Sequence, residues 1–205
     1  MKLRKHELHI ISTGTQTIET FAEIAVSIQE YVDYFHLREK QMSALQLYQA
    51  VNLLKTKGIP LSKIIINDRV DVAWAANTYG VQLPHHSLDG AVVKKAFPGL
   101  RVGCSVHSYH EAKEAEQKRA NFAMYGHIFQ TNSKPGTGPR GLGELKEITR
   151  DIELPIIAIG GIKPSNCAEV LRAGAKGIAV MSGILLADDP LKEVKAYSGV
   201  LERGK

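Results

Sequence analysis

Residues 156–162 read Ile-Ile-Ala-Ile-Gly-Gly-Ile, and residues 177–183 read Gly-Ile-Ala-Val-Met-Ser-Gly. In each stretch a short apolar run ends beside glycine, which is typical of a strand that is buried on both faces and then turns sharply. Residues 164–173 lie between the two stretches and carry the three- and four-residue apolar spacing of an amphipathic helix. A strand, a helix and a second strand in this order predict a βαβ unit with parallel strands.

The same alternation of strand and helix runs through the whole chain. An open Rossmann sheet is disfavoured because residues 11–15, Ile-Ser-Thr-Gly-Thr, lack the glycine fingerprint expected after a first strand. Eight units of roughly 25 residues instead favour closure, so we predict an α/β fold, a single (β/α)₈ TIM barrel over residues 1–205. The expected strands are 8–12, 33–37, 63–66, 80–83, 101–104, 122–125, 156–159 and 177–180, and the clearest helices are 17–31, 44–57, 110–119 and 164–173.

The composition suits a cytoplasmic protein that binds an anionic small molecule. The 205 residues carry a net charge of +5, and 44% of them are hydrophobic, which excludes a disordered chain. The basic residues are scattered, except at residues 2–6, so nucleic-acid binding is not expected. Cys104 and Cys167 suggest a reducing compartment rather than a disulfide framework, and no apolar run reaches the length of a membrane span. A homo-oligomer is compatible with the sequence.

Glycines at the ends of the last two expected strands predict a phosphate-binding site. In a TIM barrel the loops after strands 7 and 8 commonly hold a phosphate with backbone N–H groups. Glycine lets the backbone approach an anion closely, and Ser182 can donate its hydroxyl and begin a short helix. The residues expected to bind phosphate are Gly160, Gly161, Met181, Ser182 and Gly183.

The segment after the sixth expected strand, residues 129–143, is long and rich in glycine. Long loops in compact domains usually serve a function, so we expect a lid that closes over substrate. Thr131, Ser133 and Lys134 lie in this loop and are expected to contact the substrate.

Several motifs resemble those of the thiamin phosphate synthase superfamily, and they occur in the same order along the chain. They are His-Leu-Arg-Glu-Lys at 36–40, Asn-Asp-Arg-Val-Asp-Val-Ala at 67–73, Gly-Cys-Ser-Val-His at 103–107, Gly-His-Ile-Phe at 126–129, Thr-Asn-Ser-Lys at 131–134, Ile-Gly-Gly-Ile at 159–162 and Met-Ser-Gly-Ile at 181–184.

Two departures from the synthase pattern indicate a particular branch of that superfamily. A synthase joins a pyrimidine pyrophosphate to a thiazole phosphate and holds Mg²⁺ with aspartates after strands 3 and 4. Asp68 matches the first aspartate, but residues 85–87 read His-His-Ser where acidic residues are usual, and imidazoles are poor ligands for Mg²⁺. His127 also stands where the synthases usually have proline. The resemblance is therefore to the TenI-type thiazole tautomerases, which implies an isomerase of thiamine biosynthesis with no metal and no organic cofactor.

The tautomerase resemblance implies a thiazole phosphate substrate and a base that moves a proton between two carbons. His127, at the end of the sixth expected strand, is the candidate general base, with His107 as second choice. Arg38 and Lys134 are expected to bind the substrate carboxylate, and Asn67 and Ser105 to orient the ring.

Two further functions remain open at this stage. The first is a working thiamin phosphate synthase, which turnover with both synthase substrates and Mg²⁺ would demonstrate. The second is a non-catalytic regulatory protein that senses a thiazole phosphate, which would bind the ligand without chemistry.

Overall fold

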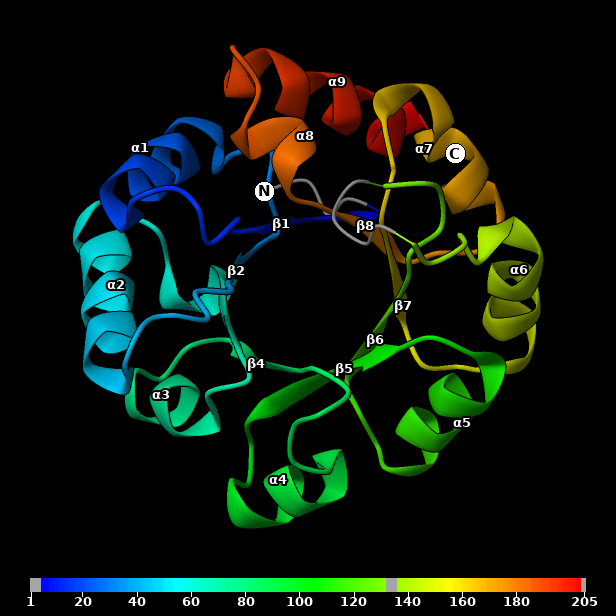
Figure 1. Ribbon diagram of the computed structural model, residues 1–205, viewed down its shortest axis with the longest axis horizontal. Coiled ribbons are helices and arrows are strands. Elements are labelled where there is room, and N and C mark those ends of the chain that lie inside the picture. Colours follow the sequence, from blue (N-terminus) through cyan, green and yellow to red (C-terminus); the bar gives the residue numbers. More distant parts are fainter. Residues whose placement is uncertain (1–4, 132–135, 204–205) are drawn as a thin grey trace.

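The computed structural model describes residues 5–131 and 136–203, and eight parallel strands form one closed barrel in it (Figure 1). Each strand pairs with the next in sequence, and β1 also pairs with β8, so the predicted (β/α)₈ barrel is confirmed. The strands are β1 Glu7–Ile11, β2 Tyr34–Leu37, β3 Ile64–Asn67, β4 Gly80–Leu83, β5 Arg101–Val106, β6 Phe122–Gly126, β7 Ile156–Ile159 and β8 Gly177–Val180.

Helices follow the strands and surround the barrel (Figure 1). The helices are α1 Ile18–Ile28, α2 Ala44–Thr56, α3 Val70–Ala75, α4 Gly90–Ala96, α5 Tyr109–Gln117, α6 Gly141–Asp151, α7 Pro164–Arg172, α8 Ser182–Leu185 and α9 Pro190–Arg203, with a 3₁₀ turn η1 at Leu61–Lys63. Among the described residues no helix combines the length and the apolar character needed to cross a bilayer.

Local side-chain chemistry sets several of the helix ends. Thr17 was expected inside α1, but its backbone is extended and its side chain accepts a hydrogen bond from the N–H of Thr20, so it caps the helix from outside. At α2, Ser43 and Gln46 exchange side-chain and backbone bonds in a capping box. The strand end that deviates most from expectation is that of β5, which continues two residues further, to Val106.

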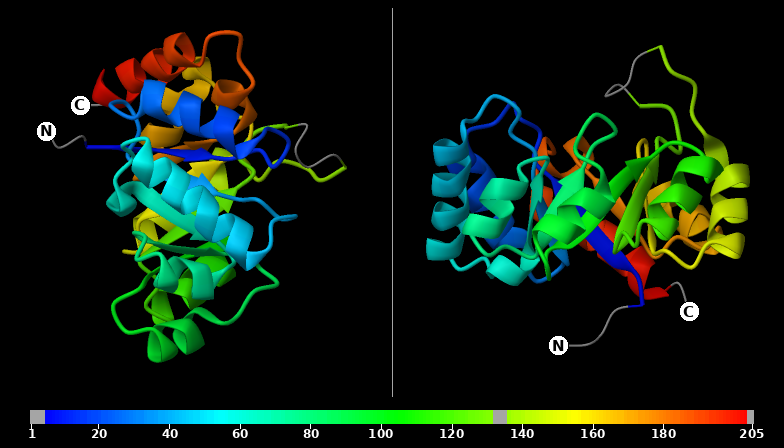
Figure 2. Two further views of the ribbon diagram at one scale, coloured as in Figure 1. Left: turned by 90° about the vertical axis from the view of Figure 1, so that its left-hand side faces the viewer. Right: turned by 90° about the horizontal axis from the view of Figure 1, so that it is seen from below.

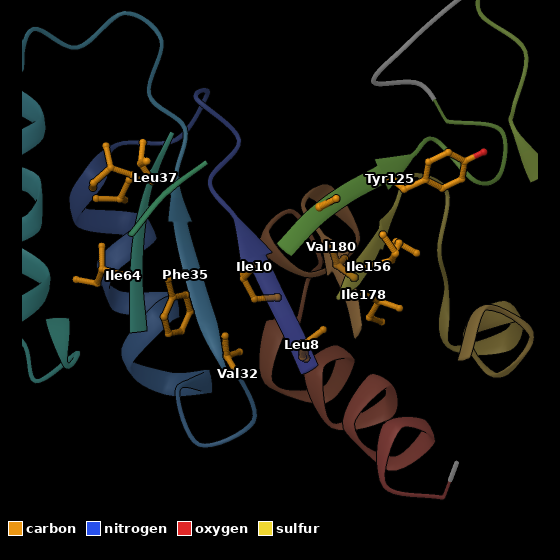
Figure 3. Packing of buried hydrophobic residues seen from close by; sticks show 14 of the residues in the cluster. Leu8, Ile10, Val32, Phe35, Leu37, Ile64, Tyr125, Ile156, Ile178 and Val180 are labelled. Atoms are coloured by element: carbon orange, nitrogen blue, oxygen red, sulfur yellow. The ribbon is translucent and has the colours of Figure 1, made fainter. Parts of the chain in front are cut away.

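Buried apolar residues form two separate layers, and alternate residues of one strand can belong to different layers. On β3, Ile64 and Ile66 belong to the large layer between strands and helices, whereas Ile65 faces the smaller cluster inside the barrel. Figure 3 shows part of the outer layer. The inner cluster is completed by Ile11, Phe122, Met124, Ile157 and Ala179.

The two ends of the barrel are differently built. The start of β1 and the end of α9 lie at one end, whereas the described parts of the β6–α6 loop rise from the opposite end (Figure 2). Since all strands run in the same direction, that second end collects all their carboxyl termini, where barrel enzymes place their sites.

The packing inside the barrel generates a prediction about stability. Ile157 is fully buried in the inner cluster, so Ile157→Ala leaves a cavity that the closed sheet cannot fill. We expect the free energy of unfolding, measured by urea denaturation, to fall by about 2–5 kcal/mol. The matched control is Val92→Ala on α4, whose side chain is exposed and should change stability by less than about 0.5 kcal/mol. Equal effects of the two substitutions would contradict this packing.

Candidate active site

A cavity of about 920 Å³ opens at the carboxyl ends of the strands. Its wall contains every described residue that the sequence predicted for the site, while Ser133 and Lys134 lie outside the described residues. The predicted residues that line the cavity are Arg38, Asn67, Ser105, His127, Thr131, Gly160, Gly161, Met181, Ser182 and Gly183.

The ends of β7 and β8 form one side of this cavity. The carbonyl of Gly160 accepts a bond from the N–H of Phe129, and the carbonyl of Gly161 accepts one from the Asn166 side chain. Ser182 and Gly183 are the first residues of α8, so their N–H groups have no partner within that helix. This side of the cavity can therefore receive an anion.

Close packing is a second reason why glycine is needed at the end of β7, and the sequence did not reveal it. A Cβ on Gly160 would lie 2.2 Å from the Cβ of His127, and one on Gly161 would lie 2.5 Å from the carbonyl oxygen of Gln130. Both glycines also have positive φ angles. Larger residues at these positions would thus disturb the β6–α6 loop as well as any bound anion.

His127 joins the barrel to the loop that follows β6. Its side chain is buried, and Nε2 lies 3.2 Å from the carbonyl oxygen of Thr137. The N–H of Arg140 donates back to the His127 carbonyl, and α6 begins at Gly141, two residues before the predicted end of the loop. The imidazole of His107 donates from Nδ1 to the carbonyl of Gly126, so this ring nitrogen is occupied.

Cationic side chains line a different part of the rim, after β2 and β3. Arg69 forms an ion pair with Asp71, whereas Arg38 and Lys40 have no ion-pair partner among the described residues. The N–H of Arg38 donates to Ser12 Oγ at 2.8 Å, which fixes the backbone from which this guanidinium extends.

The donors at the ends of β3 and β4 do not fit a preformed Mg²⁺ site. Asp68 lines the cavity, but the β4 loop contributes His85 and His86 beside it, and Mg²⁺ prefers hard oxygen ligands. Glu39 is the other carboxylate in the wall, and its Oε2 lies near Gly14 of the β1–α1 loop. No cluster of three or more metal-ligating side chains occurs in the part of the chain that the structure describes.

Two further residues line the cavity, and the sequence analysis missed one of them, Gln82. His36 on β2 and Gln82 on β4 both line the cavity and are almost fully buried. Gln82 Nε2 donates to Ser105 Oγ at 3.0 Å, while Gln82 Oε1 has no hydrogen-bond partner within the described residues. A polar side chain within an otherwise apolar strand was the available signal for Gln82.

Known proteins resemble this chain along most of its length. The family described as thiamine monophosphate synthase matches residues 8–184. Thiamine-phosphate synthase of Chloroflexus aurantiacus is 39% identical over 157 residues, which cover 74% of this chain and 71% of that protein. The synthase of Pyrococcus horikoshii is 31% identical over 199 residues, covering 97% and 96%. A solved thiamine phosphate pyrophosphorylase from Pyrococcus furiosus superposes with a TM-score of 0.83 at 29% identity, covering 98% of both chains.

These comparisons correct the functional prediction. The relatives are named as synthases, which are transferases, so the predicted thiazole tautomerase and the predicted isomerase class are wrong. The broader prediction, the superfamily with its barrel and its place in thiamine biosynthesis, is confirmed. On the strength of a family match across most of its length, the chain belongs to the thiamine monophosphate synthase family.

Proposed function

We propose that the chain is a thiamine-phosphate synthase, which joins a pyrimidine pyrophosphate to a thiazole phosphate and releases pyrophosphate. The observation that supports this proposal is that the rim of one cavity carries two separate groups of residues suited to binding anions. Backbone N–H groups and Ser182 form the first at β7 and β8, and Arg38 with Lys40 forms the second after β2. Two phosphorylated substrates need two such regions around one reaction space.

The two regions differ in chemistry, and we use this difference to assign one substrate to each region. A cradle of backbone N–H groups suits a compact monophosphate, so we assign the thiazole phosphate to β7 and β8. The guanidinium of Arg38 and the ammonium of Lys40 suit the larger charge of a pyrophosphate. During transfer the carbon–oxygen bond to pyrophosphate breaks and a carbon–nitrogen bond to the thiazole forms. Positive charge beside the departing pyrophosphate stabilises it as its bond breaks.

The remaining lining residues hold the two rings. Asn67 and Ser105 extend from the ends of β3 and β5 and are assigned to orienting the rings, and Thr131 to closing the cavity from the β6–α6 loop. The proposed transfer removes no proton from carbon, so it needs no general base at His127. We assign His127 the positioning of the loop, through its contact with the Thr137 carbonyl.

A second candidate function is a non-catalytic sensor of a thiazole phosphate. The observation that favours it is the set of donors at β3 and β4, where His85 and His86 accompany the single carboxylate of Asp68. Such a protein would keep the phosphate cradle without the ability to promote the departure of pyrophosphate.

The proposed reaction predicts turnover when both substrates are supplied. We expect thiamine phosphate and pyrophosphate to form in equal amounts, measured by chromatography and by a coupled pyrophosphate assay. Arg38→Met should reduce kcat/KM by about 100-fold, because it removes a charged hydrogen-bond donor from the departing group. Tight binding of a thiazole phosphate without any turnover would favour the sensor instead.

The side chains after β3 and β4 are poor ligands for Mg²⁺, so we predict that turnover does not depend on a divalent metal. We expect equal kcat in the presence of a strong chelator and in the presence of added Mg²⁺. Activity that disappears with the chelator and returns only with Mg²⁺ would contradict this interpretation of Asp68, His85 and His86.

The phosphate cradle predicts a specific role for the Ser182 hydroxyl. Ser182→Ala removes one donor to a charged ligand, so the Kd of inorganic phosphate should rise about 10-fold in calorimetric titration. Ser27→Ala on α1 is the matched control, because among the described residues that hydroxyl bonds only to the Ile24 carbonyl of its own helix. An unchanged Kd in Ser182→Ala would remove this hydroxyl from the phosphate site.

A further inference from the structure

A tyrosine from the last helix lies directly behind the proposed phosphate site. Tyr197 belongs to α9, which packs against α1, α7 and α8 along one side of the barrel (Figure 1). Only 2% of this residue is exposed, yet it forms part of the cavity wall. The reaction proposed above gives Tyr197 no role.

The Tyr197 hydroxyl holds the turn after β7. It donates to the carbonyl oxygen of Ile162 at 2.9 Å, from a position 35 residues further along the chain. The carbonyls of Gly160 and Gly161, just before Ile162, also accept bonds from other parts of the chain. Because the C=O and N–H of a trans peptide point in opposite directions, these bonds together fix where the N–H groups of the turn point.

The same hydroxyl lies against the first turn of α8. A Cβ on Gly183 would lie only 3.1 Å from the Tyr197 oxygen, so the absence of a side chain at Gly183 leaves the room that the hydroxyl occupies. The far end of α8 is held by Gln16, whose Nε2 donates to the Leu185 carbonyl at 2.9 Å. The hydroxyl therefore lies between the two segments to which the phosphate was assigned.

The Tyr197 hydroxyl keeps its proton near neutral pH. Burial raises the pKa of Tyr197 to about 12, and the negative charge of Glu193 acts in the same direction. A neutral phenol has one proton to donate, and the Ile162 carbonyl accepts it. The hydroxyl is thus a fixed link between parts of the protein rather than an acid or a base.

We propose that Tyr197 is a positioning residue, which holds the turn after β7 and the start of α8 at the spacing that one phosphate group requires. The hydroxyl bonds to the first segment and packs against the second, so it acts on the phosphate through the backbone of both. The inference rests on the proposed function, which places the thiazole phosphate between these segments. It adds that α9, which supplies no phosphate ligand in that proposal, sets the geometry of the site.

Loss of the hydroxyl should weaken phosphate binding in particular. Without it the Ile162 carbonyl loses its partner, and the turn must be ordered when the ligand binds, which lowers affinity. Only the thiazole substrate is assigned to these two segments. The loss should therefore appear in the KM of that substrate and leave kcat and the other KM unchanged.

The direct test is Tyr197→Phe, which removes one oxygen and keeps the ring. We expect the Kd of inorganic phosphate, measured by calorimetric titration, to rise about 3- to 10-fold, and the KM of the thiazole phosphate to rise by a similar factor. Both kcat and the KM of the pyrimidine pyrophosphate should stay within about twofold. An unchanged Kd in the folded variant would overturn the proposal.

Gly183→Ala gives a second test that depends on the same contact. In the wild-type background the added methyl group presses on the Tyr197 hydroxyl, so the Kd of phosphate should rise. In the Tyr197→Phe background the methyl group gains the space of the missing oxygen, so its effect on Kd should be at least about threefold smaller. Equal effects in both backgrounds would show that the methyl group obstructs the phosphate itself, and would overturn the proposal.

Tyr34→Phe is the matched control. It removes a hydroxyl that donates to Tyr79 at the start of β2, at the opposite end of the barrel. Both Tyr→Phe variants should be less stable in urea, but only Tyr197→Phe should change the Kd of phosphate, so equal rises in Kd would overturn the proposal. The titration uses phosphate alone, so its result stands even if the chain proves inactive as a synthase. A wild-type protein that binds no phosphate would overturn the proposal as well.

Discussion

The pairing of β1 with β8 closes the sheet, and every feature of the cavity depends on that closure. The two strands run in parallel from Glu7 beside Gly177 to Ile10 beside Val180. A Cβ on Gly177 would lie 2.4 Å from the carbonyl oxygen of Glu7, so this glycine is needed for the strands to meet. Closure brings the ends of β7 and β8 around to the cationic residues that follow β2, so that all of them line one cavity.

Much of this arrangement could be predicted because it depends on local sequence. Apolar runs of four or five residues indicated the strands, and the Gly-Gly and Ser-Gly turns indicated two strand ends that line the cavity. The bond from Tyr197 to the Ile162 carbonyl was beyond that reasoning, because it joins residues 35 positions apart and depends on how α9 packs against the barrel.

The prediction of a tautomerase failed because too much weight was given to a few residues. Residues 85–87 and His127 differ from the pattern expected of a synthase, and these differences were interpreted as a change of reaction. The resemblance over residues 8–184 to proteins named as synthases outweighs those few positions. The structure adds that His127 is engaged with the loop after β6, which gives its side chain a role without proton transfer.

The central claim is that one cavity holds both halves of the product, with a separate anion region for each phosphorylated substrate. A crystal structure with thiamine phosphate bound tests it most directly. The account predicts the phosphate against Gly160, Gly161, Ser182 and Gly183, and the two rings beside Asn67 and Ser105. A phosphate bound at Arg38 and Lys40 would contradict it.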